Sequence, residues 1–339
     1  MAKTVRLADI AQRVGVSTVT VSKALAGQKG VSEEMREKIK QLADEMGYVQ
    51  SSKAKRAGVR KSYNIGLLIE ESYLDKYDSF YWQMYQQIAT KAMAWGCFTL
   101  MEVVGGQSKE APEMPKLIKE QKVDGVIVLG KMPDFFLEML KKASSLPIVY
   151  MDFTDEGQDV DAVVSDSFYG TYRLTNYLFS MGHEKIAFVG TLLATSSITD
   201  RYLGYVKAML EHGAKLRDDW RIDDRDLHSG YIDEVNLLTL PDDMPTAFVC
   251  NCDLSAGMLI NKLRQNGYRV PEDVSVVGYD NYIYPGICDI GITTYEVDLG
   301  EMAKRTVKVL LSKLQNQAGA QSTYIVEGHL VIKDSVRRI

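Results

Sequence analysis

The chain lacks several features that mark other classes of protein. Its four cysteines are irregularly spaced, and the pair Cys250 and Cys252 has no second pair or histidine cluster beside it, so we expect buried thiols rather than a zinc site. No apolar run approaches the roughly 18 residues that a membrane span needs. The opening MAKTVRLADI lacks the apolar stretch of a secretory signal. We therefore predict a cytoplasmic protein with no membrane partner.

Motifs of enzymatic chemistry are also missing. The chain has no phosphate-binding G-x-x-x-x-G-K-[ST], no G-x-S-x-G nucleophile elbow and only four scattered histidines. The string DLGEM at 298–302 lacks the threonine of a D-x-G-x-T phosphate loop, which argues against a sugar kinase. We predict that the protein is not an enzyme, has no catalytic residues, and binds no cofactor or metal.

The net charge of −5 conceals two oppositely charged parts. Residues 1–63 hold 13 Lys and Arg against 6 Asp and Glu, whereas the remainder holds 27 against 39. A basic N-terminal segment on an acidic body is typical of a nucleic-acid-binding domain joined to a domain with another role.

The periodicity of residues 7–47 predicts three short helices. Leu7, Ile10, Ala11 and Val14 share one helix face, and Gly15 follows where a left-handed cap is expected. Ser17 then stands at the N-cap position of a second helix over 18–26, whose inward face is Val21, Ala24 and Leu25. A third helix begins after Ser32 and turns Met35, Ile39, Leu42 and Met46 inward. Two short helices, a glycine turn and an exposed polar face predict a helix-turn-helix.

From residue 64 onward, short apolar runs alternate with amphipathic helical patterns, which predicts doubly wound α/β sheets. The two stretches 64–163 and 164–292 repeat this pattern, as two similar subdomains would. Ligands of such sheets bind beyond the carboxyl ends of the strands, so we expect a cleft that faces both sheets. The runs expected to form buried parallel strands are 65–69, 98–104, 125–129, 148–151, 162–165, 186–190, 247–250, 274–279 and 324–332.

The motifs LADIAQRVGVSTVTVSKALAG, VSEEMREKIKQLADEMGY, GHEKIAFVG, RVPEDVSVVGYDN and VEGHLVIKDS, taken in order, resemble the lactose-repressor and galactose-repressor (LacI/GalR) family over essentially the whole chain. The resemblance implies a helix-turn-helix domain over 1–49, a hinge over 50–63, and a periplasmic-binding-protein-like body over 64–339 that binds an effector and dimerises. It also implies that the body's chain crosses three times. One subdomain then holds 64–163 and 293–322, and the other holds 164–292 and 323–339.

The same resemblance assigns DNA contacts in the head and the hinge. Thr18, Val19 and Lys23 match positions that face base edges in the major groove, where threonine and valine suit a thymine methyl group. Ser17, Ser22 and Tyr48 match residues that contact the DNA backbone and so position the protein on the duplex. In the hinge, Ala57 stands where relatives carry a leucine that is wedged into the minor groove, so we expect charge to hold this hinge. The basic hinge residues expected to contact DNA are Lys53, Lys55 and Arg56.

Eight residues are expected to contact the effector. Asp152 and Asp280 match hydroxyl acceptors at strand ends, and Arg201 matches the arginine that clamps the effector, with Ser197 one helical turn before it. The others are Tyr73, Phe80 and Tyr81, which suit stacking on a sugar face, and Cys252, which replaces the usual asparagine with a weaker hydrogen-bond donor.

We therefore predict a transcriptional regulator, most simply a repressor, that acts as a homodimer on a roughly palindromic double-stranded DNA operator. A small effector, expected to be a sugar or sugar derivative, binds between the subdomains and is coupled to operator affinity. A nucleobase or a protein corepressor in place of the sugar is the alternative. A solute-binding protein that does not bind DNA would share the two-lobed fold but would require export, and the N-terminal residues predict DNA-binding helices instead of a signal. The sequence names neither the effector, its direction of action, nor the operator.

Overall fold

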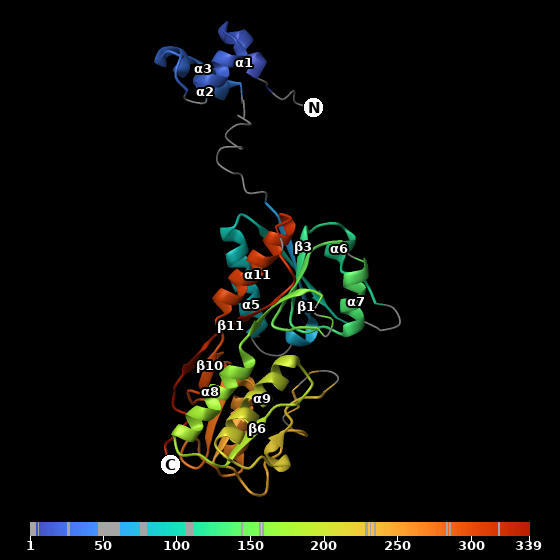
Figure 1. Ribbon diagram of the computed structural model, residues 1–339, viewed down its shortest axis with the longest axis vertical. Coiled ribbons are helices and arrows are strands. Elements are labelled where there is room, and N and C mark those ends of the chain that lie inside the picture. Colours follow the sequence, from blue (N-terminus) through green and yellow to red (C-terminus); the bar gives the residue numbers. More distant parts are fainter. Residues whose placement is uncertain are drawn as a thin grey trace. The chain divides into compact units, whose positions relative to one another are not determined.

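The computed structural model falls into two units, 1–62 and 63–339, which are described separately (Figure 1). The residues that it describes are 5, 7–25, 28–46, 62–74, 80–105, 112–143, 145–155, 157, 159–227, 230, 232–233, 235–282, 284, 286–317 and 319–339.

The N-terminal unit contains the three predicted helices, α1 (Leu7–Val14), α2 (Thr18–Leu25) and α3 (Glu33–Glu45). Gly15 adopts φ +79°, as expected of a helix C-terminus, and the Ser17 hydroxyl accepts a hydrogen bond from the Thr20 amide at 3.1 Å. Its small core joins all three helices and consists of Ile10, Ala11, Val21, Ala24, Ile39 and Ala43. The helix-turn-helix prediction is confirmed.

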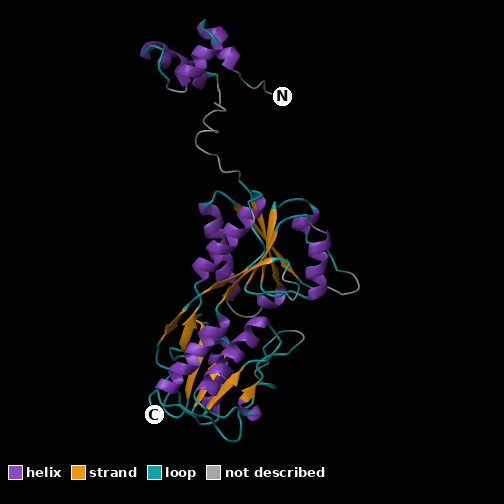
Figure 2. Cartoon of the chain, in the orientation of Figure 1, coloured by secondary structure: helices purple, strands orange, loops and turns teal. Residues whose placement is uncertain are grey.

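The first subdomain of the body is a parallel sheet in the order β11-β5-β4-β3-β1-β2. Alternate residues of its strands point to opposite faces, so that Leu67 packs toward α5 and α11 while Leu68 packs toward α7. Figure 2 shows helices on both faces of this sheet. Its elements are β1 (Asn64–Glu70), η1 (Glu71–Tyr73), α5 (Phe80–Ala94), β2 (Phe98–Val104), α6 (Lys116–Lys119), β3 (Gly125–Leu129), α7 (Asp134–Ala143), β4 (Ile148–Met151), β5 (Asp161–Ser165), α11 (Leu299–Leu314) and β11 (Thr323–Val326).

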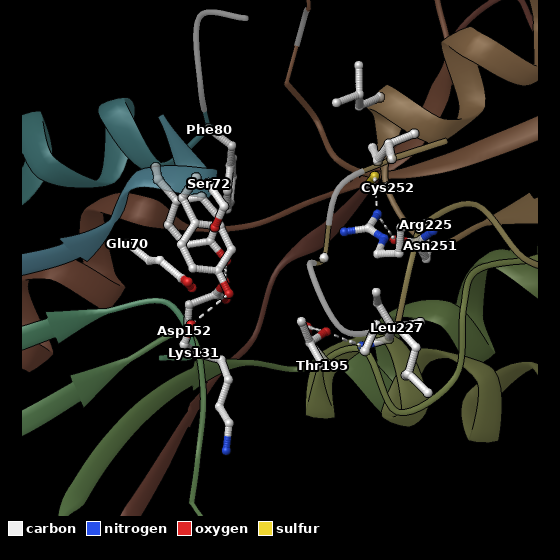
Figure 3. Close-up of a pocket in the computed structure, with 18 of the residues that line it drawn as sticks. Glu70, Ser72, Phe80, Lys131, Asp152, Thr195, Arg225, Leu227, Asn251 and Cys252 are labelled. Atoms are coloured by element: carbon white, nitrogen blue, oxygen red, sulfur yellow. Dashed lines mark hydrogen bonds between the residues drawn. The ribbon is translucent and has the colours of Figure 1, made fainter. Parts of the chain in front are cut away.

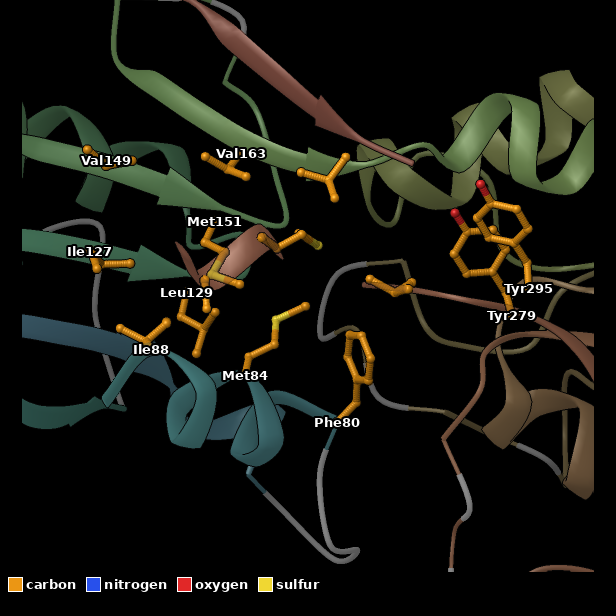
Figure 4. Close-up of a cluster of buried hydrophobic side chains, with 14 of the residues drawn as sticks. Phe80, Met84, Ile88, Ile127, Leu129, Val149, Met151, Val163, Tyr279 and Tyr295 are labelled. Carbon is orange, nitrogen blue, oxygen red and sulfur yellow. The ribbon is translucent and has the colours of Figure 1, made fainter. Parts of the chain in front are cut away.

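The second subdomain has the sheet order β12-β10-β9-β8-β6-β7, in which only β12 is antiparallel to its neighbour among the described strands. One hydrophobic cluster continues from α5 and the first sheet to Tyr279 and Tyr295 of the second (Figure 4). The elements of the second subdomain are α8 (Ser167–Ser180), β6 (Ile186–Val189), α9 (Ser196–Glu211), η2 (Asp218–Trp220), β7 (Arg221–Ile222), β8 (Ala247–Cys250), α10 (Asp253–Gln265), β9 (Ser275–Asp280), β10 (Thr293–Glu296) and β12 (His329–Val331).

The structure corrects three sequence predictions about the body. Strand β10 pairs with β9 and stays in the second sheet, whereas β11 pairs with β5 in the first, so the predicted boundaries at 293 and 323 are both a few residues early. The run 324–332 is two strands in two different sheets. Strand β2 is an edge strand that leaves Phe98 65% exposed, so it is not buried as predicted. Among the described residues, no helix is both long and apolar enough to cross a membrane.

Candidate functional site: a cleft in the body and an exposed helix in the head

A cavity of about 680 Å³ lies between the two subdomains of the body, and all eight predicted effector residues line it. The resemblance assigned the two carboxylates among them, and both also stand where the strand-end rule expects a ligand, since Asp152 follows β4 and Asp280 ends β9. Both turn the chain through positive φ, +72° at Asp152 and +104° at Asp280, a backbone conformation that costs energy for a residue with a Cβ. In Figure 3 residues of the first subdomain lie on one wall and residues of the second on the other.

The wall from the first subdomain is aromatic and acidic. The rings of Tyr73 and Tyr81 lie 4.3 Å apart over Gly130, where a Cβ would meet a Tyr73 ring atom at 2.8 Å. The Tyr81 hydroxyl donates a hydrogen bond to Asp152 at 2.9 Å. Desolvation raises the pKa of Asp152, although Arg201 and the Tyr81 hydrogen bond oppose the rise. This wall offers carboxylate oxygens and ring faces to a ligand.

Phe80 lies on the same wall but serves packing as well. Its side chain is 6% exposed, and its ring meets Tyr81 from its own subdomain and Tyr282 from the other, at 5.9 and 6.2 Å between centroids. The ring therefore bridges the two subdomains at the back of the cavity as well as lining it.

The opposite wall is built around Arg201, which α9 presents one turn after Ser197. Its Nη1 donates to the backbone oxygen of Asn251 at 2.6 Å, and its Nη2 lies 3.5 Å from Asp280. The guanidinium also stacks over the Tyr279 ring, 3.7 Å from the centroid. Burial would lower the pKa of Arg201, but Asp280 and Tyr279 outweigh that effect, so the arginine stays charged.

The pKa of Asp280, a carboxylic acid on this wall, lies far above its ordinary value. Burial raises its pKa to about 7, because the long contact with Arg201 compensates only part of the lost hydration and Asp152 adds repulsion. A ligand hydroxyl that donates to Asp280 would stabilise its ionised form.

Sequence reasoning missed a second polar cluster on the same wall. Arg225 is held by the neighbouring Asp224 through two hydrogen bonds, from Nε at 3.1 Å and from Nη2 at 2.8 Å. Its Nη2 also approaches the Asn251 side-chain oxygen at 3.1 Å and the Cys252 sulfur at 3.7 Å. Asn251 directly follows the run AFVC and was within reach of the strand-end rule, whereas Arg225 follows β7, a two-residue strand that no apolar run predicts.

Cys252 lies in this cluster and lines the cavity. Its sulfur is 3.3 Å from the Ser255 hydroxyl, and burial raises the pKa of the thiol even though Arg225 opposes the rise. The thiol is therefore protonated at neutral pH and offers the cavity only a weak donor.

In the head, the predicted DNA-contacting residues of α2 and its cap are exposed: Ser17, Thr18, Val19, Ser22 and Lys23. Val19 is 60% exposed although it is apolar and stands in a helix whose Val21 is fully buried. An exposed valine beside threonine and lysine suits contact with base edges. The other predicted DNA contacts, Tyr48, Lys53, Lys55, Arg56 and Ala57, lie outside the described residues.

A helix-turn-helix unit joined to a two-sheet body with a polar cleft defines a DNA-binding transcriptional regulator that carries a ligand-binding domain. Comparison with known proteins agrees: residues 6–51 match the model for bacterial regulatory proteins of the lacI family, and residues 175–336 match that for a periplasmic binding protein-like domain. The chain belongs to the LacI/GalR family of DNA-binding transcriptional repressors.

Relatives and solved structures extend the match over the whole length. The HTH-type transcriptional repressor PurR of Pasteurella multocida is 28% identical over 331 residues, which cover 97% of this chain and 98% of that protein. PurR of Vibrio campbellii is 26% identical, with 98% of each chain covered. The lac repressor dimer bound to operator and the anti-inducer ONPF has a TM-score of 0.65 at 23% identity, covering 99% of this chain and 100% of that one. The regulator CelR in complex with cellobiose has a TM-score of 0.67 at 22% identity, covering 98% and 99%. These relatives are named as repressors and regulators, which agrees with the prediction that the chain is not an enzyme.

Proposed function

We propose that the protein represses transcription as a homodimer on a roughly palindromic operator, and that a small saccharide in the body's cleft controls its operator affinity. The observation that carries the proposal is the pairing of two unlike walls across one cavity of about 680 Å³. The Tyr73 and Tyr81 rings suit the apolar face of a sugar ring, while Asp152, Asp280 and Arg201 suit its hydroxyl groups.

A nucleobase is the second candidate effector, and a specific feature favours it. The paired Tyr73 and Tyr81 rings would also stack on a planar heterocycle, and the relatives from Pasteurella and Vibrio carry the name HTH-type transcriptional repressor PurR. Asp280 supplies an acceptor for a donor group on a base edge.

Thermal unfolding of the full chain against uncharged sugars, sugar phosphates and nucleobases tests the proposal. We expect one uncharged sugar to raise the melting temperature of the body and to change operator affinity in a gel-shift titration. A shift from hypoxanthine or guanine alone would replace the sugar by the nucleobase. A compound that raises the melting temperature without changing operator affinity would contradict its role as an effector.

The pKa of Asp280 predicts how effector binding depends on pH. Because a sugar hydroxyl donates to the ionised carboxylate, affinity should increase about tenfold between pH 6 and pH 8, as one proton is released near pH 7. Calorimetry in two buffers of different ionisation enthalpy measures that proton. An affinity that is flat or falls over this range would contradict the assignment.

Without effector, Asp280 should make the free energy of unfolding fall as pH rises, whereas it makes effector affinity increase. The folded protein binds this proton between about pH 4 and pH 7 whereas the unfolded chain does not, so the free energy of unfolding should fall as pH rises through that window.

In the head, replacing Lys23 by alanine should weaken operator binding roughly 5- to 150-fold, the usual cost of a lost base or phosphate contact. If Lys23 contacts phosphate, the slope of log affinity against log salt should also decrease by about one per head. The control is Lys142→Ala on α7 of the body, where the exposed lysine pairs with Glu138 at 2.9 Å. Equal affinities for the two variants would show that Lys23 does not contact the operator.

A further inference from the structure

The Arg225 guanidinium uses two of its three nitrogen atoms, Nε and Nη2, in hydrogen bonds to described residues. Its Nε and Nη2 are both taken by Asp224, a fork-to-fork geometry that fixes the plane of the guanidinium. Among the described residues, nothing accepts a hydrogen bond from its Nη1. In Figure 3 Arg225 lies on the wall opposite Asp152, with a nitrogen directed into the space between them.

Asp224 is itself anchored and cannot leave Arg225 to make room for a ligand anion. Its side chain is 1% exposed and accepts hydrogen bonds from the Thr191 amide at 3.0 Å and from the Asn251 amide group at 2.6 Å. Burial alone would raise the pKa of Asp224, but Arg225 and the hydrogen bonds of Ser255 and Asn251 together hold it well below its usual value. Asp224 and Arg225 therefore form a fixed ion pair with no net charge.

The same balance holds for the other cations of the cavity. Within the described part of the chain, Lys131 pairs with Asp134 and Arg201 faces Asp280, so each of the three cations has its own carboxylate. Glu70, Asp152 and Asp233 also line the cavity, and none of them forms an ion pair with a cation of the described residues. An anionic ligand would therefore enter a cavity that already carries excess negative charge.

Apolar side chains of the subdomain that holds Arg225 also line the cavity. Leu227, Ile232, Leu254 and Met258 line it together with Tyr284. A guanidinium edge in apolar surroundings forms strong hydrogen bonds with a neutral acceptor, because few waters compete.

We infer that Arg225 is a specificity-determining residue of the cleft, which donates from Nη1 to an oxygen atom of an uncharged saccharide, and that the cleft rejects sugar acids and sugar phosphates. This inference rests on the proposed function and names the chemical class of its effector. The aromatic, acidic wall receives the hydroxyl donors of the ligand, and Arg225 supplies the donor for an acceptor at its other end.

Calorimetry on the full-length protein tests the inference with matched probes. The uncharged probes are cellobiose, maltose and galactose, and the matched anions are cellobionate, maltobionate and galacturonate. We expect one uncharged sugar to bind at least tenfold more tightly than its acid. In Arg225→Gln, which keeps a donor for Asp224, the affinity for that sugar should fall at least tenfold. The control is Arg221→Gln, which removes an exposed arginine of β7 that does not line the cavity.

A second variant adds net positive charge to the cavity while it keeps Arg225. Asp224→Asn keeps an oxygen acceptor but leaves Arg225 with a net positive charge, so the ratio of acid affinity to sugar affinity should increase at least tenfold. If this variant does not fold, as circular dichroism would show, the Arg225→Gln result decides alone.

The possible failures are distinguishable. An acid that binds as tightly as its parent sugar, or an Arg225→Gln variant that binds the sugar as well as the Arg221→Gln control does, overturns the inference and leaves the saccharide proposal standing. If none of the uncharged sugars binds while hypoxanthine or guanine does, the saccharide proposal itself fails and the inference fails with it. If neither a sugar nor a nucleobase binds, the saccharide proposal and the Arg225 inference are both overturned for the sugars tested.

Discussion

Replacing Arg201 by alanine is expected to weaken effector binding by at least thirtyfold. Arg201 is 6% exposed and holds three partners in place: the Asn251 backbone oxygen, Asp280 and the Tyr279 ring. Truncating one member of a buried, hydrogen-bonded charge pair costs roughly 2–5 kcal/mol, which is about thirtyfold to several thousandfold in affinity. Effector affinity also falls because Asp280, left buried without a cation, has a still higher pKa and is ionised to a smaller extent at neutral pH.

The measurement is a calorimetric titration of wild type and Arg201→Ala with whichever compound shifts the melting temperature of the wild type. Arg221→Ala is the control for loss of an arginine from the same subdomain. Since Arg201 lowers the pKa of Asp280, the pH dependence of any residual binding should also move to higher pH in Arg201→Ala. An unchanged affinity would place the effector outside this cleft.

The head was predictable because its determinants are local. The apolar spacing, a glycine at a helix end and a serine at the next helix start lie within a few residues of one another, and the structure places Gly15 and Ser17 in those roles. The carboxylates of the cleft were predicted from the family resemblance, and their positions also agree with the parallel-sheet rule, which needs only the end of a strand. Asp152 and Asp280 both follow buried apolar runs and both line the cavity.

The errors arise where nothing local carries the information. The strands β10 and β11 are both four-residue segments rich in β-branched residues near the C-terminus, and no residue in either indicates which sheet the strand joins. Their assignment depends on pairing with β9 and β5, which are distant in sequence. Arg225 was missed because β7 has two residues, too few for a period of two to be detected.

Replacing Gly204 by alanine should destabilise the body by about 3 kcal/mol. Gly204 lies in α9 where the helix crosses α8, and a Cβ there would meet the Phe168 backbone oxygen at 2.1 Å and the Tyr172 amide nitrogen at 3.0 Å. Backbone atoms of a packed helix do not swing aside as a long side chain does, so the two helices must separate. For a domain of this size the melting temperature should fall by roughly 6–12 °C.

The control is Gly319→Ala, because a Cβ at Gly319 meets nothing within 4 Å and its φ is not positive. That variant should melt within about 2 °C of the wild type, since exposed substitutions away from special features change stability by less than about 0.5 kcal/mol.

The crossing also bears on the cleft, because Gly204 lies three residues after Arg201 on the same helix. Displacing α9 from α8 would shift the Arg201 guanidinium relative to its partners Asn251, which follows β8, and Asp280, which ends β9. We therefore expect Gly204→Ala to weaken effector binding as well as to lower the melting temperature, even at temperatures where the variant is fully folded. A lower melting temperature with unchanged effector affinity would show that the helix accommodates the methyl group by moving its C-terminal end, leaving the start of α9 in place.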